Sequence, residues 1–232
     1  MAIPVDLSSW TAEGGGSWTL TSGNEFVTQT LNGSPGVYFN GANSQGNKFS
    51  AQVKVRTASD DDFLGFVLGY NAGDINNDSS EYLLIDWKQA DQDGFFGGTS
   101  LAGLAISRVT QSLGDDSGAW LHSNTQGVEE LQRATNLGST GWNDYTTYDF
   151  DLVFTASLVE FYVDDVLELS VNGDFNDGSF GFYNYSQAYV KYGGVTQTSL
   201  RLDVAAVPEP GSILLLGLGL LGLIVAKRKN VV

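Results

Sequence analysis

Between residues 49 and 154, apolar and polar residues follow the periods that are typical of β-strands. Residues 49–55 alternate strictly, with Phe, Ala and Val at odd positions and Ser, Gln and Lys at even ones, which predicts a strand with one buried face. Residues 148–154 alternate in nearly the same way. The runs 63–70 (FLGFVLGY) and 82–87 (YLLIDW) are almost continuously apolar, a pattern that indicates central strands of a sheet.

The rest of the first 206 residues continues this pattern, with glycine clusters and Asn/Asp turns between the apolar segments. Residues 158–163 and 166–171 predict a hairpin closed over Asp164-Asp165. Further strands are predicted at 179–184, 188–195 and 199–204, whereas 128–136 (VEELQRATN) can form either a short helix or a loop. About ten or more short strands without a repeat or linker predict an all-β fold, a two-sheet antiparallel sandwich of jelly-roll type.

Residues 207–232 are organised differently. A Pro208-Glu209-Pro210 box is followed by the apolar run 213–226 (ILLLGLGLLGLIVA) and the basic triplet 227–229 (KRK). As a helix the apolar run is roughly 21 Å long, against a bilayer core of about 30 Å. It predicts a short C-terminal transmembrane helix that spans only marginally, with its basic end on the cytoplasmic side.

These three elements, in this order at the terminus, resemble the PEP-CTERM sorting signal of Gram-negative bacteria. The resemblance implies an exported protein whose precursor is anchored in the inner membrane, is cut near the box by an exosortase, and then reaches the cell surface or the extracellular space. The alternatives are a plain membrane anchor or a buried apolar helix. We therefore divide the chain into a β-domain, residues 1–206, and a sorting tail, residues 207–232.

Composition narrows the possible partners. Hydrophobic residues make up 42% of the chain and aromatic residues 12%, enough for a substantial core. Without the tail, 8 Lys/Arg (11 minus 3) stand against 26 Asp/Glu (27 minus 1), a net charge of −18. This charge argues against nucleic acid or anionic lipid as partners, and it favours bound cations or a self-repelling soluble surface.

The sequence contains neither cysteine nor a signal-peptide pattern. The chain has no cysteine, so a disulfide framework, a thiolate metal site and a Cys nucleophile are all excluded. The first residues lack the basic and apolar regions of a signal peptide, and we expect an export signal to have been removed ahead of residue 1.

Asp60, Asp61 and Asp62 form the first candidate metal site. Three adjacent carboxylates before a central strand repel one another, and a calcium ion, which accepts oxygen ligands in flexible geometry, relieves that repulsion. The alternative is a solvated polar turn.

A second candidate has the spacing D-x-N-x-D at Asp74, Asn76 and Asp78. It lacks the glycine and glutamate that complete an EF-hand, so a looser calcium loop and an ordinary Asn/Asp connection remain the alternatives. The segment 174–177 (DFND) has a similar composition and is the weakest of the three candidates.

Catalytic patterns are poorly represented, and we expect no enzyme. His122 is the single histidine, and no Gly-x-Ser-x-Gly elbow precedes a plausible helix. The strand at 82–88 carries only Asp86, not the carboxylate pair of a retaining glycosidase. A zinc site lacks its His/Cys set. Aromatic residues that could stack on sugar rings or lie in the core are Trp87, Trp120, Trp142 and Tyr145.

From about residue 38, the order of motifs resembles the C-terminal, lectin-like domain of thrombospondins. The resemblance rests on DDDFLGFVLGY at 60–70, YLLIDWKQ at 82–89 and GSFGFYNYSQ at 178–187, with GLAI, AWLH and GWNDY between them. It implies a concanavalin-like (L-type-lectin-like) jelly roll that is extracellular, binds calcium, mediates adhesion and has no catalytic activity. The chain departs from the family in lacking its type 3 repeats and cysteines, and in placing Asp86 before Trp87.

Together these observations predict an exported, non-enzymatic, calcium-binding β-sandwich that acts in adhesion or association with the extracellular matrix, with a matrix protein or exopolysaccharide as the possible partner. The alternative is a lectin-like carbohydrate-binding module for exopolysaccharide. A glycosidase is a third hypothesis, and it requires two carboxylates close together in a groove.

Overall fold

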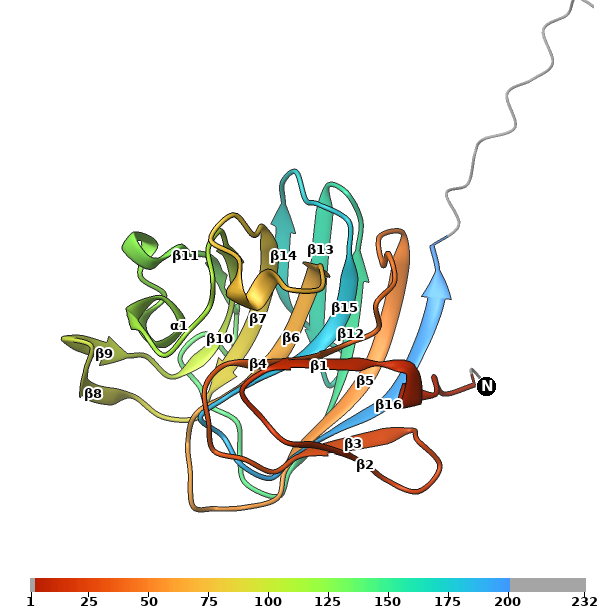
Figure 1. The fold of residues 1–232 in the computed structure, drawn as a ribbon, viewed down its shortest axis with the longest axis horizontal. Coiled ribbons are helices and arrows are strands. Elements are labelled where there is room, and N and C mark those ends of the chain that lie inside the picture. The colour runs from red at the N-terminus through yellow and green to blue at the C-terminus, as the bar shows by residue number, and fades with distance from the viewer. Residues whose placement is uncertain (1–2, 201–232) are drawn as a thin grey trace, which may run out of the picture. The chain divides into compact units, whose positions relative to one another are not determined.

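Two seven-stranded antiparallel sheets make up the β-domain in the computed structural model, which describes residues 3–200 (Figure 1). In spatial order, sheet A contains β1 (Thr11–Gly14), β4 (Gly36–Phe39), β15 (Ser179–Tyr185), β6 (Phe63–Tyr70), β7 (Tyr82–Lys88), β10 (Gly103–Val109) and β11 (Val128–Arg133). Sheet B contains β14 (Val166–Asn172), β13 (Leu158–Val163), β12 (Thr147–Phe154), β5 (Asn47–Val55), β16 (Val190–Ser199), β3 (Phe26–Gln29) and β2 (Trp18–Leu20).

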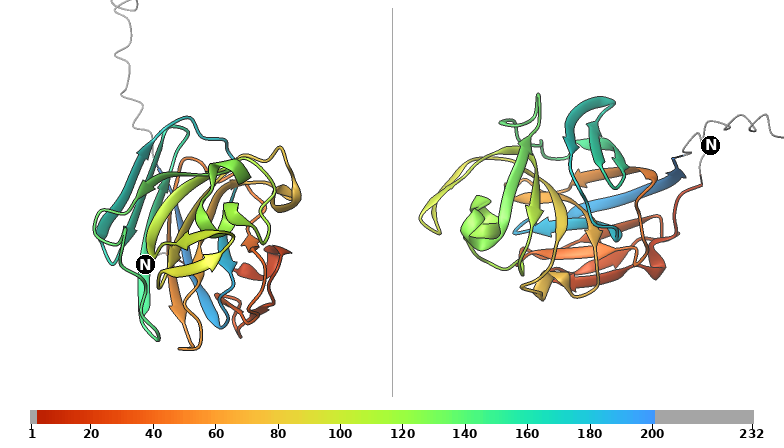
Figure 2. Two further views of the ribbon diagram at one scale, coloured as in Figure 1. Left: turned by 90° about the vertical axis from the view of Figure 1, so that its left-hand side faces the viewer. Right: turned by 90° about the horizontal axis from the view of Figure 1, so that it is seen from above.

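The connections between these strands hold a two-stranded ribbon and four short helices. The ribbon consists of β8 (Gln92–Phe95) and β9 (Gly98–Ser100), and it belongs to neither large sheet. The helices are η1 (Leu7–Ser9), η2 (Asp74–Asn76), α1 (Ser117–Leu121) and η3 (Asn124–Gln126). Both views of Figure 2 show the ribbon and α1 at the same end of the domain.

The inner faces of the two sheets form the main core. Alternate residues of β5 are buried, as the period of two in the sequence predicts. Phe49 of β5 stacks on Phe180 of β15 with ring centroids 4.5 Å apart, and Phe66 of β6 meets Phe150 of β12 edge to face at 5.2 Å. Each fully buried phenylalanine contributes roughly 1.5–3 kcal/mol to stability, so these cross-sheet aromatic pairs hold the sandwich together.

The outer face of sheet A is also buried, which explains the continuous apolar runs. Every residue of β6, β7 and β15 is buried. The connecting segments that contain η2 and α1 pack on this outer face, and a second hydrophobic cluster joins the two. It includes Ile75 of η2, Leu113, and Ala119 and Trp120 of α1. Central strands with both faces covered contain few polar positions, and their sequences therefore read as almost uniformly apolar.

Most of the predicted strands are confirmed. The hairpin of β13 and β14 closes over Asp164 and Asp165, both with positive φ (48° and 66°), as a two-residue type I′ turn requires. The all-β, two-sheet antiparallel sandwich is confirmed as well.

One local prediction is wrong. Residues 128–133 form the edge strand β11 instead of a helix or loop, because pairing with β10 outweighs the local helix propensity of Glu, Leu and Gln. The strand predicted at 188–195 is observed as β16, which runs further, over residues 190–199, and most of the strand predicted at 199–204 lies outside the described residues. The register irregularity between Gly193 and Thr196 lets this strand continue past the glycine pair.

The predicted sorting tail, including the box at 208–210 and the apolar run at 213–226, lies outside the described residues. Within residues 3–200, no helix is long and apolar enough to cross a membrane.

Candidate metal site and adjoining cavity

Asp60, Asp61 and Asp62 lie directly before β6, and the structure brings their carboxylates together. One oxygen from each lies within 4.8 Å of the others. Asp62 is buried, whereas Asp60 and Asp61 are partly buried. We call these three residues the acidic cluster.

The backbone of the acidic cluster is fixed by three distant side-chain and backbone groups. The Asp62 N–H donates to Gln187 Oε1 (3.0 Å), and the Asp62 carbonyl accepts from Trp142 Nε1 (3.1 Å). The Asp61 carbonyl accepts from the Gln89 N–H at 3.1 Å. These bonds come from buried or paired segments, so the carboxylates are held in place by the sandwich itself.

Each carboxylate of the cluster also accepts a hydrogen bond from a side-chain nitrogen. The donors are Asn32 Nδ2 to Asp60, Gln92 Nε2 to Asp61 (2.7 Å) and Lys88 Nζ to Asp62 (2.6 Å). Within the described part of the chain, Lys88 is the only cation that forms an ion pair with the cluster. Three aspartates against one ammonium leave an excess of negative charge.

Lys88 is completely buried beneath the cluster. Its side chain is 0% exposed and that of Asp62 is 4% exposed. The ammonium also donates to Gln92 Oε1 and lies over the rings of Phe63 (4.8 Å) and Trp120 (4.6 Å). The ammonium is therefore compensated inside the domain by the ion pair with Asp62 and by the two aromatic rings.

Crowding in the cluster shows in the titration of Asp60. Burial, the charge of Asp62 and a hydrogen bond shared with Asp62 raise the pKa of Asp60 from 3.8 to about 6. Asp60 thus takes up a proton more readily than an ordinary aspartate does, because burial disfavours the ionised form and a proton also relieves the repulsion from Asp62.

A calcium ion fits this donor set. Calcium binds six to eight oxygen ligands, chiefly carboxylates, carbonyls and water, at about 2.3–2.6 Å. Three converging carboxylates with two uncompensated negative charges supply the charge and the first ligands, and the part-exposed edge at Asp60 and Asp61 admits water for the rest.

A cavity of about 520 Å³ adjoins the cluster. Two residues of the acidic cluster, Asp60 and Asp62, line it. The aromatic lining residues are Phe95, Phe96, Trp120 and Tyr185, and the other polar ones are Asn32, Ser34, Gln92, Asp115 and Ser186. Ser34 Oγ donates to Asp115 Oδ2 at 2.5 Å. The cavity therefore combines carboxylates with aromatic rings.

In the second predicted metal loop, the side chains of Asp74 and Asp78 form hydrogen bonds within the domain. Asp74 is buried, and its Oδ2 accepts from the Asn71 N–H (2.7 Å), which closes the turn into η2. Asp78 Oδ1 accepts from Ser112 Oγ, which ties this loop to the segment over sheet A. Asn76 ends η2. Among residues 3–200, the acidic cluster is the one group of three or more His, Asp or Glu side chains whose ligand atoms lie close enough together to hold a single metal ion.

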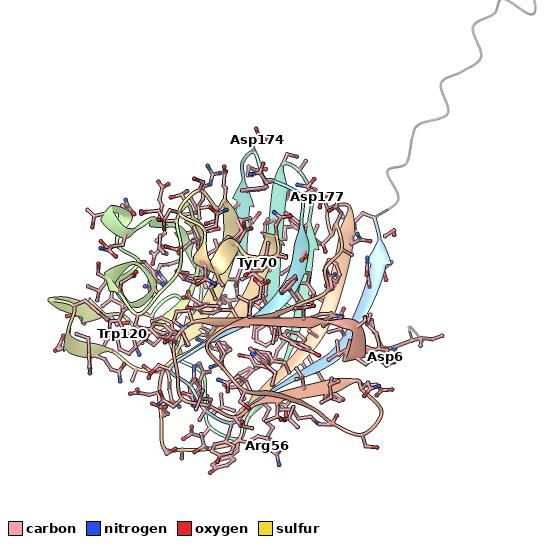
Figure 3. The ribbon with its side chains drawn as sticks, viewed as in Figure 1. Asp6, Arg56, Tyr70, Trp120, Asp174 and Asp177 are labelled. Atoms are coloured by element: carbon pink, nitrogen blue, oxygen red, sulfur yellow. The ribbon has the colours of Figure 1, made fainter. Side chains whose placement is uncertain are left out.

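The weakest metal candidate, 174–177, lies in the loop between β14 and β15, well away from Trp120 (Figure 3). Asp177 Oδ1 accepts from the N–H groups of Ser44 and Gln45 (3.0 Å each) and of Gly178 (2.8 Å). This carboxylate therefore has a clear structural role in joining two loops.

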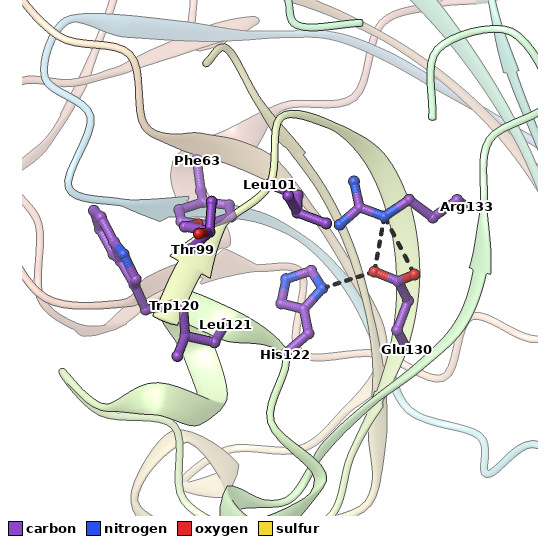
Figure 4. Close-up of a pocket in the computed structure, with 9 residues that line it drawn as sticks. Phe63, Thr99, Leu101, Trp120, Leu121, His122, Glu130 and Arg133 are labelled. Atoms are coloured by element: carbon purple, nitrogen blue, oxygen red, sulfur yellow. Dashed lines mark hydrogen bonds and ion pairs between the residues drawn. The ribbon is translucent and has the colours of Figure 1, made fainter. Parts of the chain in front are cut away.

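His122 lies in a partly buried charge network that the sequence did not reveal. Its Nε2 is 3.0 Å from the buried Asp86 Oδ2. Its Nδ1 is 3.4 Å from Glu130 Oε2, and Arg133 Nε also donates to Glu130 at 3.0 Å (Figure 4). Burial by itself lowers the pKa of His122, but the two carboxylates outweigh it and raise the pKa to about 9. The ring is therefore an imidazolium at neutral pH, with both nitrogens engaged, and it has no lone pair for general-base catalysis.

A smaller cavity of about 250 Å³ lies beside this network and is lined by Thr99 and Ser100 of the ribbon, by Leu101, which follows the ribbon, and by Trp120 (Figure 4). Of the four aromatic residues considered for sugar stacking, Trp87 and Trp142 are core residues. Tyr145 is 58% exposed, and Trp120 lines both cavities.

The fold and this site define a lectin-like β-sandwich with an acidic site at one end of a central strand. The thrombospondin C-terminal region, as a family, matches residues 15–200, and the chain belongs to this family. Residues 206–229 match the PEP-CTERM protein-sorting motif. The family and the sorting motif predicted from the sequence are both confirmed.

Proteins similar in sequence to this chain include a thrombospondin and cartilage oligomeric matrix protein. Thrombospondin-2 of Gallus gallus is 27% identical over 207 residues, which are 82% of this chain and 17% of that protein. Cartilage oligomeric matrix protein of Rattus norvegicus is 27% identical over 139 residues, 57% of this chain and 18% of that protein. The chain thus spans less than a fifth of the length of these relatives.

Similar solved structures include two carbohydrate-binding proteins. The carbohydrate-binding module CBM66 from Bacillus subtilis has a TM-score of 0.59 and 12% identity, and the match covers 82% of this chain and 96% of that one. The exoplasmic/lumenal domain of VIP36, in a form bound to Ca²⁺ and mannose, has a TM-score of 0.53 and 14% identity, with 85% of each chain covered. At such identities the likeness shows a shared fold.

Proposed function

We propose that this protein is an exported, non-enzymatic β-sandwich that binds calcium at Asp60, Asp61 and Asp62 and acts in adhesion or matrix association. The observation that carries the proposal is the acidic cluster: three carboxylates converge within 4.8 Å against a single buried ammonium. Calcium bound there stabilises the native state, because the unfolded chain does not hold the three carboxylates together. Membership of the thrombospondin C-terminal family supports both the calcium site and the adhesive role.

Direct calcium binding tests this assignment. We expect isothermal titration of the full chain to show calcium binding that disappears in D60N/D61N/D62N. The matched control is D149N/D164N/D165N, which removes the same charge from sheet B and its hairpin turn, and it should bind like the wild type. Binding that survives in the triple variant of the cluster, or is lost equally in both triple variants, would place the ion elsewhere.

The C-terminal motif supports the second part of the proposal. We keep the division into a domain at 1–206 and a sorting tail at 207–232. In this scheme the tail anchors the precursor in the inner membrane until an exosortase-type enzyme processes it near Pro208-Glu209-Pro210, and the product reaches the cell surface or the extracellular matrix. Replacing the box by three alanines should leave full-length precursor in the inner membrane; unchanged processing would contradict this.

Carbohydrate binding is the second candidate function. The cavity beside the acidic cluster favours it, since aromatic rings and carboxylates together are the groups that recognise sugars. CBM66 and VIP36 show that related folds carry carbohydrate sites in other proteins. A glycan array with the full chain tests this candidate, and the absence of binding at millimolar glycan would remove it.

Asp74, Asn76 and Asp78 remain a proposal for a further calcium loop. The buried Asp74 and the Asp78–Ser112 hydrogen bond show that two of the three side chains already have structural partners. Calcium stoichiometry decides the matter: one ion per chain would leave the acidic cluster alone, and two would support the loop.

A further inference from the structure

The ribbon of β8 and β9 carries an exposed aromatic pair at its turn. Phe95 is 55% exposed and Phe96 is 49% exposed. Phe96 has a positive φ of 52° and lies between Gly94 and Phe95 on one side and Gly97 on the other. Two adjacent phenylalanines that remain exposed at the tip of a polar ribbon indicate a contact surface for something outside the domain.

Both rings face the cavity beside the acidic cluster. Phe95 and Phe96 line it together with Asp60, Asp62 and Trp120. Phe95 also packs against Trp120, with ring centroids 5.3 Å apart. The cavity, at about 520 Å³, falls within the range of 300–1,000 Å³ that is usual for small-ligand sites.

Trp120 supplies an independent sign of a ligand. The residue is only 6% exposed, and its Nε1–H has no hydrogen-bond partner among the described residues. Buried indole N–H groups almost always have an acceptor, and because Trp120 lines both cavities, a ligand or a water molecule bound in one of them can supply it.

The remaining lining residues define the chemistry of that molecule. Side-chain hydroxyls, an amide and carboxylates line the cavity at Asn32, Ser34, Asp115 and Ser186, and none of its lining residues is a lysine or arginine. Carboxylates accept hydrogen bonds from pairs of hydroxyls, whereas aromatic rings stack on the apolar face of a sugar ring. The acidic lining repels sulfate, phosphate and uronate groups.

We propose that this cavity binds a neutral sugar unit of a glycan, with its apolar face on Phe95 and Phe96 and its hydroxyls bonded by Asp60, Asn32 and Asp115. The inference rests on the second candidate function and assigns its site and ligand class. Because Asp60 also belongs to the acidic cluster, the aromatic residues are the ones whose substitution separates glycan binding from calcium binding.

The test compares two variants of the full chain, one at the turn of the ribbon and one directly after it. F95S/F96S removes the aromatic pair, and L101S removes an equally exposed side chain (53%) that lines only the smaller cavity. The probes are neutral oligosaccharides of glucose, mannose, galactose and xylose, with oligogalacturonate as the acidic counterpart. Binding is measured by titration calorimetry and by quenching of tryptophan fluorescence.

We expect a neutral oligosaccharide to bind, with an affinity about tenfold or more lower in F95S/F96S, a loss of about 1.4 kcal/mol per tenfold, and unchanged in L101S. The site is overturned if no neutral oligosaccharide binds, if F95S/F96S binds as well as the wild type, or if oligogalacturonate binds better. Calcium titration of F95S/F96S keeps the two proposals apart: calcium binding without glycan binding leaves the calcium function standing, and the reverse result leaves only the glycan site.

Discussion

Replacement of Lys88 by methionine tests whether the charges under the acidic cluster are truly buried. The Lys88–Asp62 pair is 2.6 Å long, and its side chains are 0% and 4% exposed. Removal of the ammonium leaves the Asp62 carboxylate buried beside two further aspartates without a counter-charge. Breaking a buried pair in this way costs about 3–5 kcal/mol.

The loss should be visible in a thermal melt. For a domain of this size, each kcal/mol corresponds to about 2–4 °C in Tm, so K88M should melt about 6–20 °C below the wild type in the presence of a chelator. Added calcium should restore part of the loss, because the ion replaces the missing positive charge.

Two controls identify the cause. K88M/D62N removes both charges and should recover much of the stability, since a neutral pair of similar volume avoids the buried unpaired charge. K48M breaks the more exposed Lys48–Asp151 pair (2.8 Å, side chains 43% and 27% exposed), and its cost should stay below about 1 kcal/mol. If K88M melts within about 2 °C of the wild type, or if K88M/D62N melts no higher than K88M, the account of a buried pair is wrong.

Three further expectations follow from the charges and the packing. The folded-state pKa of His122, about 9, lies above the unfolded value of 6.5. The protonated His122 therefore contributes roughly 3 kcal/mol to the free energy of unfolding below pH 6.5, and this contribution is lost as the pH rises through 9. Urea unfolding at pH 6 and pH 9.5 should show the loss in the wild type but not in H122Q. Calcium must displace the proton of Asp60, whose pKa is about 6, so the calcium affinity from calorimetry should fall by up to about tenfold per pH unit below 6, and a flat profile from pH 7 to 5 would contradict the assignment. G65A should fail to fold or lose most of its stability in circular dichroism, because a Cβ there would lie 1.9 Å from the Ile85 carbonyl oxygen, whereas G181A, whose nearest contact is 2.8 Å, should remain folded with a lower Tm.

The fold could be predicted largely because long strands have a strong period. Residues 49–55 alternate strictly, and β5 pairs on both sides in the middle of sheet B. The edge and ribbon strands were missed or mistaken, since β1, β8 and β9 have only three or four residues and are defined by their partners. The burial of the outer face of sheet A could not be predicted either, because it depends on where the irregular segment that contains α1 packs.

The candidate site was predictable only in part. Three consecutive aspartates can be recognised in any sequence, but their counter-charge comes from Lys88, 26 residues away, which the pairing of Phe63 with Lys88 brings beside Asp62. His122 and Asp86 are 36 residues apart and meet only because α1 folds back over β7. In both cases the strand register and the packing of a connecting segment determine the chemistry, and neither leaves a local pattern.

The most direct test of the calcium assignment is a thermal melt of the full chain in millimolar Ca²⁺ and in chelator. A ligand at about 100 times its dissociation constant adds about 2.7 kcal/mol, so calcium should raise the Tm by about 5–11 °C. The rise should vanish in D60N/D61N/D62N and persist in D149N/D164N/D165N. Identical melting curves for the wild type in the two buffers would contradict a stabilising calcium site at the acidic cluster.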